Sequence, residues 1–259
     1  MGHKDSPTIT ARFGGGSMSI DQHRVYREFD PNATISDANL TAIIHAAQRA
    51  PSWMNGQHYS IINVSDPAQR QAIVELQPKN PQIGQCSVFL VFVIDGYRAF
   101  LANQSQNQDK SVSFAGFADV DTLITLTTDA AMAAQNATLA AESLGYVTCP
   151  IGGLRQAGKA LIDLLALPKY TYPIFGLCIG TPVADMPIKP RLPMDAVFFD
   201  NRYQTDALPK LLAQYEQTML EFGEAREKLP YRQKFAQFYR QPYVAEGEAW
   251  LKSQGFLEQ

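Results

Sequence analysis

The sequence predicts an α+β fold, in which one buried sheet carries helices on both faces. The strongest strand signal is Ser87–Asp95 (SVFLVFVID), a continuous apolar run that is typical of a strand covered on both sides. Tyr172–Gly180 (YPIFGLCIG) gives a second buried strand. Helical patterns are mixed with the strands without a regular βαβ alternation or an internal repeat, which favours an α+β sheet.

Length and composition allow one large domain or two small ones. The chain has 259 residues, of which 46% are hydrophobic and 18% charged, and its formal net charge is −3. This charge indicates neither nucleic acid nor an anionic membrane as a partner. The N-terminus lacks the apolar core of a signal peptide, and the tract Leu123–Leu144 contains Asp129 and Glu142, so we expect a buried helix there and no membrane span.

Cysteine and histidine usage argues against a metal site. The three cysteines form no CxxC pair, which indicates neither a disulfide framework nor a zinc site, and we expect them to be small buried residues. The four histidines are isolated in the sequence. This pattern fits a reducing compartment, and we expect a cytoplasmic protein.

The first half of the chain gives a clear order of elements. Residues 1–20 are expected to be a flexible arm or an added, non-native segment. Ser36 is placed to cap a helix that ends at Pro51. A strand follows over Tyr59–Val64, then a helix from Asp66 to about residue 76 with proline in its first turn. Residues 97–118 are expected to form a loop.

The second half is mainly helical. A long alanine-rich helix is predicted over Val120–Leu144, ended by Gly145. Its small face suits either core packing within one chain or a seam across a two-fold axis. Further predictions are a helix over 155–165, a short strand over 197–199 and a helical segment over 205–259.

Common catalytic signatures are missing. The sequence has no GxSxG, no GxGxxG after a strand and no P-loop, so neither a nucleophile elbow nor a Rossmann turn is indicated. Four short clusters remain: HRVYREF (residues 23–29), PSWMNGQ (51–57), IGGLRQ (151–156) and IKPRLP (188–193). Taken singly, each has an ordinary structural explanation as a solvated face, a helix cap, an element boundary or a turn.

Together these clusters resemble the FMN-dependent nitroreductase family, and most closely its branch of NADPH nitroreductases and flavin oxidoreductases. HRVYREF matches the pattern HRSxRxF, IGGLRQ matches IGGxRN, and GLCIGTP with KPRLP matches the late motif. The resemblance spans about residues 20–203. It implies a nitroreductase-like fold with a mostly antiparallel central sheet, FMN at a homodimer interface, and residues 21–259 as a single FMN-binding domain with a C-terminal helical extension.

The resemblance also implies a cofactor site. Basic residues would hold the phosphate, Arg27 would lie beside the flavin N(1)–C(2)=O edge, and glycine would bring bare backbone against the ring. Val25 stands where the family has serine, which removes one hydrogen bond. The implied FMN-binding residues are His23, Arg24, Val25, Arg27, Pro51, Ser52, Trp53, Asn55, Asn80, Pro150, Ile151, Gly152, Gly153, Lys189 and Arg191.

The implied reaction is ping-pong reduction of nitroaromatics, quinones or free flavins, which are the small-molecule electron acceptors. NADPH, with NADH as the alternative, would give a hydride to the flavin and leave before the acceptor binds, and no catalytic side chain is required. Arg226, Arg232 and Arg240 are candidates for the 2′-phosphate of NADPH. Two alternatives are a flavin-sequestering protein of the same fold with little turnover and an FMN-independent hydrolase.

Overall fold

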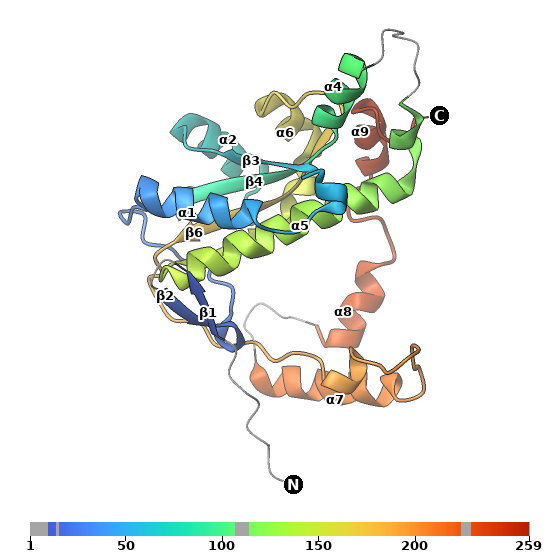
Figure 1. Ribbon diagram of the computed structural model, residues 1–259. Coiled ribbons are helices and arrows are strands. Elements are labelled where there is room, and N and C mark those ends of the chain that lie inside the picture. The colour runs from blue at the N-terminus through green and yellow to red at the C-terminus, as the bar shows by residue number, and fades with distance from the viewer. Residues whose placement is uncertain (1–9, 14–15, 107–113, 224–228, 259) are drawn as a thin grey trace. The chain divides into compact units, whose positions relative to one another are not determined.

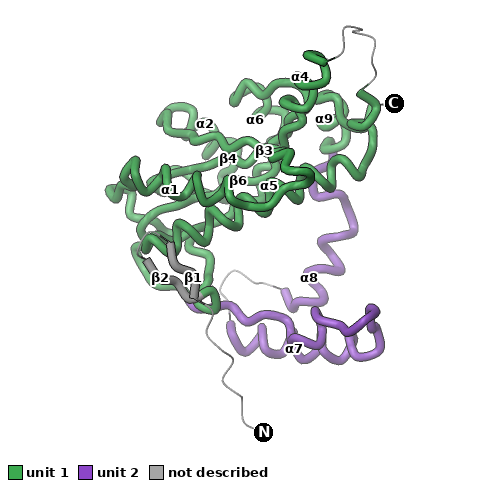
Figure 2. The backbone as a smooth tube through the Cα atoms, in the orientation of Figure 1, with its two compact units in different colours: residues 1–186, 246–259 green, residues 187–245 purple. Residues whose placement is uncertain are grey.

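The computed structural model describes residues 10–13, 16–106, 114–223 and 229–258. The chain divides into two compact units (Figure 2). The first comprises residues 1–186 together with 246–259, and the second comprises residues 187–245. Each unit is described separately below.

The first unit contains a four-stranded sheet in the order β3-β4-β6-β5. Its strands are β3 (Tyr59–Asn63), β4 (Val88–Asp95), β5 (Val147–Ile151) and β6 (Thr171–Gly180). Every neighbouring pair is antiparallel, with a register irregularity between Phe92 and Val93 where β4 pairs with β6. The expected antiparallel sheet is therefore confirmed, with the two strongest predicted strands at its centre.

Helices cover both faces of this sheet (Figure 1). On one face, Leu90, Phe92 and Ile94 of β4 join a core with α1 (Asp37–Gln48) and α5 (Val120–Ser143). On the other face, Phe89, Val91 and Val93 join a second core with α2 (Pro67–Leu76), α3 (Gln82–Gln85) and α6 (Gly158–Leu164). All eight residues of β4 are buried, because both of its faces are covered.

The alanine face of α5 packs inside the chain. Ala130, Ala133 and Ala137 are fully buried in the core shared with α1 and the sheet. The opposite side of the helix is exposed and carries Ile124 and Met132. Core packing within one chain therefore explains the small residues of this helix.

The predicted caps are present. The Ser36 hydroxyl accepts a hydrogen bond from the Asn39 N–H at the start of α1, and Asp66 caps α2 through the Gln69 N–H. These caps explain why the sequence located both helix starts correctly.

The predicted loop over residues 97–118 is wrong in part. It contains α4 (Tyr97–Gln106) and the short helix η3 (Ala115–Ala118). The Asp95 carboxylate accepts from the Tyr97 N–H at the start of α4. Phe100 of α4 then packs against the Tyr170 ring at a centroid distance of 4.9 Å. An acidic cap and tertiary aromatic packing thus order a segment whose Gln- and Asn-rich composition indicated a loop.

Two other elements differ from expectation. β5 was not anticipated, because Pro150 interrupts its apolar pattern; the strand tolerates proline because it lies at the edge of the sheet. The predicted strand over 197–199 is absent from the described residues, where η5 (Met194–Ala196) ends at Val197 and Phe198 is exposed. The helix expected from residue 155 begins earlier, as η4 (Gly152–Ala157) before α6.

The N-terminal segment and the chain's end complete the first unit. β1 (Thr10–Phe13) pairs with β2 (Gly16–Ser19) as an antiparallel hairpin, followed by η1 (Ile20–Gln22). α9 (Gly247–Ser253) contacts α6. The second unit contains α7 (Leu208–Phe222) and α8 (Tyr231–Phe238), which confirms a helical C-terminal part. Among the described residues, no helix is long and apolar enough to cross a membrane.

Candidate functional site

The basic segment 23–29 lies along the edge strand β5. The Tyr26 N–H donates to the Thr148 carbonyl at 3.0 Å, and Phe29 forms a β-bridge with Pro182. Val25 packs against the second core, which gives a packing reason for an aliphatic residue at this position. Arg27 is half-buried beside the buried Tyr26. The segment is thus a fixed extension of the sheet.

Two carboxylates orient the cationic side chains of this segment. Glu142, at the end of α5, accepts from His23 Nδ1 at 2.9 Å and from the Thr148 hydroxyl at 2.8 Å. Asp185 accepts from Arg24 Nη2 at 2.6 Å and from the Tyr26 hydroxyl at 2.8 Å. The hydrogen bond from Arg24 lowers the pKa of Asp185, and the same bond raises the pKa of Arg24. Arg24 is therefore held at a defined place.

The glycine pair follows β5 directly. Gly152 is exposed, and a Cβ built on it would meet only Arg155 Nη1, at 3.8 Å. Leu154, the next residue but one, is fully buried and anchors the turn. Gly176 of β6 makes room for that anchor, because a Cβ there would lie 3.0 Å from Leu154 Cδ1. The structure therefore presents open backbone at Gly152 on a firmly seated turn.

Asn80 is linked to the same strand through a buried glutamine. The amide of Gln82 donates to the Asn80 side-chain oxygen at 3.2 Å and to Cys149 Sγ at 3.7 Å. Cys149 and Pro150 lead into the glycine pair. Segments 23–29, 80 and 150–153 thus meet along β5.

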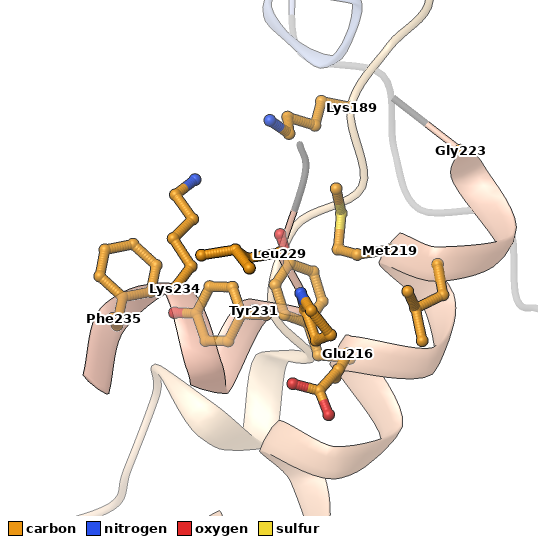
Figure 3. A pocket seen from close by; sticks show the side chains of 11 residues that line it. Lys189, Glu216, Met219, Gly223, Leu229, Tyr231, Lys234 and Phe235 are labelled. Carbon is orange, nitrogen blue, oxygen red and sulfur yellow. The ribbon is translucent and has the colours of Figure 1, made fainter. Parts of the chain in front are cut away.

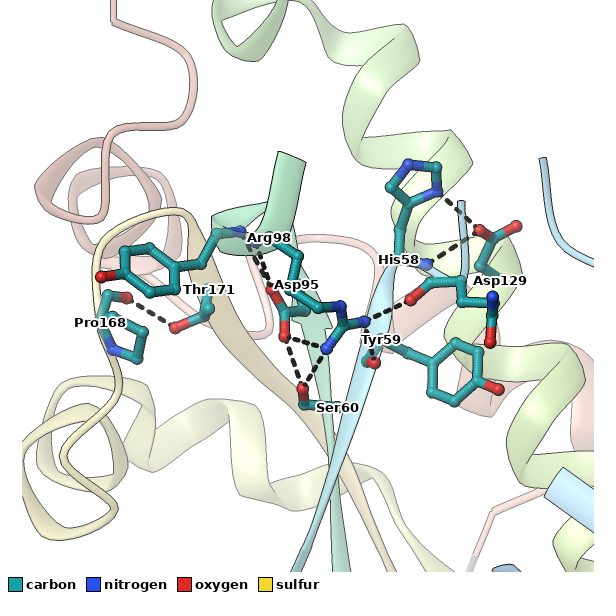
Figure 4. Close-up of polar contacts among 10 residues, drawn as sticks. His58, Tyr59, Ser60, Asp95, Arg98, Asp129, Pro168 and Thr171 are labelled. Carbon is teal, nitrogen blue, oxygen red and sulfur yellow. Dashed lines mark hydrogen bonds and ion pairs between the residues drawn. The ribbon is translucent and has the colours of Figure 1, made fainter. Parts of the chain in front are cut away.

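The loop 51–58 lies elsewhere, against the middle of α5. The buried Asp129 carboxylate accepts from the Trp53 N–H at 2.9 Å. It also accepts from the His58 N–H at 3.2 Å and from His58 Nδ1 at 2.8 Å (Figure 4). Ser52 Oγ accepts from the Gln57 N–H. Trp53 is exposed at the loop surface, beside a cavity of about 340 Å³ that also involves α5.

The backbone of this loop is strained. Met54, Asn55 and Gln57 have φ angles of 50°, 57° and 51°. Asn tolerates this left-handed region better than Met or Gln, and each such residue costs roughly 1–3 kcal/mol. The side chains that grip the loop must therefore offset this strain.

The loop and the basic segment are far apart within one chain. Asp129 holds the loop and Glu142 holds His23, and the two acids are both on α5. Their separation of 13 residues corresponds to about 20 Å along a helix that rises about 1.5 Å per residue. The described chain therefore does not bring all predicted cofactor residues to one place.

The remaining predicted residues belong to the second unit. Arg191 donates to the Lys189 carbonyl at 2.8 Å, and the Tyr215 hydroxyl donates to the Pro190 carbonyl at 3.0 Å, so α7 fixes the KPR loop. Lys189 also lines a cavity of about 270 Å³ at α7 and α8, whose walls include the rings of Tyr231 and Phe235 (Figure 3).

The three candidate nucleotide-binding arginines differ in their surroundings. Arg232 is paired with Glu216: its backbone N–H, Nε and Nη2 all donate to that carboxylate. Arg240 follows α8 and is exposed. Arg226 lies outside the described residues. The guanidinium of Arg232 is therefore engaged by Glu216, whereas the side chain of Arg240 is exposed to solvent.

Sequence reasoning missed the residues that orient the site. In the sequence, Asp129 and Glu142 appear only as polar breaks in an apolar tract, and Arg98 lies in a segment whose composition indicates a loop. A usable signal was present: Asp129 falls between Leu126 and Ala133 on the buried helical stripe. A carboxylate at such a position needs buried donors, because an unpaired buried charge is too costly. Among the described residues, no cluster suitable for a metal ion is found.

The chain belongs to the nitroreductase family. The family model matches residues 20–181, and the model of the nitroreductase family's C-terminal domain matches residues 189–259. The two matches include the HRVYREF, IGGLRQ and KPRLP segments described above. Membership thus agrees with the antiparallel sheet and with the arrangement along β5.

Individual relatives are similar over nearly their whole length. An NAD(P)H FMN reductase of Bacillus subtilis is 36% identical over 92% of this chain and 96% of its own. An oxygen-insensitive NADPH nitroreductase of Salmonella typhimurium is 34% identical, covering 95% of each chain. The solved structure of NfrA2 from B. megaterium superposes with a TM-score of 0.84 at 34% identity, covering 92% of this chain and 96% of that one.

Proposed function

We propose that this protein is an FMN-dependent NAD(P)H oxidoreductase that reduces nitroaromatics, quinones or free flavins. The observation that carries the proposal is the convergence of fixed cations and open glycine backbone on β5, in a chain of this family. The names of the relatives support the same reaction class. The three reduced, buried cysteines fit a cytoplasmic location.

The residues along β5 fit the chemistry of FMN. Arg24 is held in a fixed orientation, as phosphate recognition requires, and the same segment carries His23 and Arg27. Gly152 leaves its backbone open to a flat ring, since nothing lies closer to its Cβ position than 3.8 Å. Gly153 follows it, and Asn80 adds an amide that is linked to Cys149 of β5 through Gln82.

When bound, FMN supplies the redox chemistry by accepting a hydride from NAD(P)H and passing electrons to the acceptor. The protein's residues then bind and orient. The cations on segment 23–29 would neutralise the phosphate, and Arg27 would favour negative charge at the ring edge. Lys189 and Arg191 are candidates for further phosphate contacts.

We infer that two copies of the chain build each site. Loop 51–55 lies about 20 Å along α5 from the basic segment, so one chain offers its two halves at separate places. A two-fold axis would bring the loop of one copy to the basic segment of its partner. The exposed apolar residues Ile124, Met132 and Trp53 would be covered in such a dimer.

Anaerobic titration with reduced nucleotide tests the proposal. The purified protein should be yellow. Adding one equivalent of NADPH without oxygen should bleach the flavin absorbance in a single reduction. Menadione or nitrofurazone should then restore the colour. A colourless protein that takes up no added FMN would contradict the proposal, and a yellow protein that NADPH and NADH both fail to bleach would instead be a flavin-sequestering protein.

The nucleotide preference can be measured in the same experiment. Of the arginines proposed to contact the 2′-phosphate, we choose Arg240 because its side chain is exposed to solvent. Comparing bleaching rates with NADPH and NADH, in the wild type and in Arg240→Ala, separates a 2′-phosphate contact from a general effect. A contact of this kind predicts a loss confined to NADPH.

A further inference from the structure

The loop 51–58 is gripped from two sides by residues that lie outside it. Asp129 of α5 holds the backbone N–H groups of Trp53 and His58 and the His58 ring. Arg98 of α4 holds the carbonyls of Gln57 and Tyr59. Donors and acceptors at the end of the loop are thus both satisfied from neighbouring helices (Figure 4).

Each of the two residues is itself held in place. The Asp129 side chain is 2% exposed, and its two oxygens are satisfied by the three donors of the loop. The Arg98 guanidinium also pairs with Asp95 at 2.8 Å and donates to the Ser60 hydroxyl at 3.0 Å. The Asp95 carboxylate in turn starts α4. One hydrogen-bond network therefore joins the start of α4, the end of β4 and the loop 51–58.

Packing alone does not explain how the loop 51–58 keeps its backbone conformation. The loop contains three non-glycine residues with left-handed φ, and Trp53 and Met54 are 64% and 86% exposed. A loop with so little burial of its own does not keep a strained backbone unless other groups hold it. Asp129 and Arg98 supply that restraint.

We propose that Asp129 and Arg98 are positioning residues that preorganise the cofactor loop, so that Ser52 and Asn55 meet FMN in their binding conformation. This inference rests on the proposed function, because it takes the loop to contact the flavin. Neither side chain needs to touch the cofactor. A loop already ordered in the apoprotein binds without first losing conformational freedom.

The first test uses the apoprotein and needs no flavin. In Asp129→Asn the amide group offers one acceptor in place of two, so hydrogen exchange at the Trp53 and His58 amides should accelerate about tenfold or more. Exchange in β4 should stay unchanged. Asp163→Asn, in an exposed pair with Lys159, is the matched control. Unchanged exchange at both loop amides would overturn the proposal.

The second test measures FMN affinity of the full chain by flavin fluorescence. Asp129→Asn and Arg98→Lys should each weaken FMN binding about tenfold, because lysine cannot reach four acceptors as the guanidinium fork does. Arg202→Lys, on an exposed arginine of the second unit, is the control. Because Arg98 is half-exposed, we expect Arg98→Lys to fold. This variant therefore still tests the proposal if Asp129→Asn does not fold.

The double variant distinguishes positioning from two independent structural effects. Once one anchor is lost and the loop leaves its conformation, the second has less to hold, so the combined loss in affinity should be smaller than the product of the single losses. A fully multiplicative loss would contradict a shared role. A wild type that binds no FMN would overturn the proposed function instead, while the amide exchange result would still test the restraint.

Discussion

Single residues of the site differ in how far the sequence reveals their role. Gly152 has open space where a Cβ would lie, whereas Gly176 has none. The cationic residues of the site were visible in the sequence as motifs. Their orienting partners were not, because Glu142 and Asp185 lie 119 and 161 positions from His23 and Arg24, and one sequence gives no measure of such pairing.

The glycine pair offers a clean residue-scale prediction. Gly152→Ala should leave the free energy of unfolding nearly unchanged, because its Cβ meets only Arg155 Nη1 at 3.8 Å. It should nevertheless weaken FMN binding if the ring lies against this backbone, and Gly153→Val should do so more strongly. Denaturant unfolding of the apoprotein and fluorescence titration with FMN measure the two effects separately. Normal FMN binding by both variants would remove the glycine pair from the site.

Among the elements, the two central strands and the long helix follow directly from hydrophobic pattern. β4, β6 and α5 were predicted nearly to their ends, because each has a long, uninterrupted signal. β5 and α4 were missed for opposite reasons. Pro150 weakens the strand signal of an edge strand that needs few hydrogen bonds, and α4 depends on Asp95 and on aromatic packing with Tyr170, neither of which is local composition.

The close packing of β6 on β4 gives an element-scale prediction. In Gly176→Ala the new Cβ would lie 2.6 Å from two ring atoms of Phe89, which is fully buried. Such overpacking costs about 1–3 kcal/mol of unfolding free energy. Urea denaturation measures it, with Gly84→Ala as control, because that exposed glycine of α3 has only Val74 Cγ2 at 3.4 Å. Equal stability of the two variants would contradict this packing argument.

For the whole molecule, the family and sheet type could be inferred from four motifs in order, but the distance between the loop and the basic segment within one chain could not. It depends on where α5 carries Asp129 and Glu142, which fixes loop and basic segment about 20 Å apart. A motif list places both in one site, whereas the geometry of one chain separates them.

Subunit complementation tests this separation. Arg27→Ala damages the basic segment and Asn55→Ala damages the loop, so each homodimer should bind FMN weakly. Equal mixing with subunit exchange makes half of the dimers mixed, and each mixed dimer has one intact site and one doubly damaged site. FMN capacity should then recover to about a quarter of the wild-type value. If mixing restores none, both segments act within one chain.

The three buried cysteines can report the rate at which the core under the sheet opens. Cys86, Cys149 and Cys178 all belong to the core beneath β5 and β6, and each is at most 2% exposed. Cys149 and Cys178 are direct partners across the two strands. An alkylating reagent can reach them only when that core opens, so the rate of thiol modification reports how often β5, the strand that precedes the glycine pair, detaches. Mass spectrometry of timed alkylation, with and without bound flavin, would then measure the ligand's effect on the edge strand residue by residue.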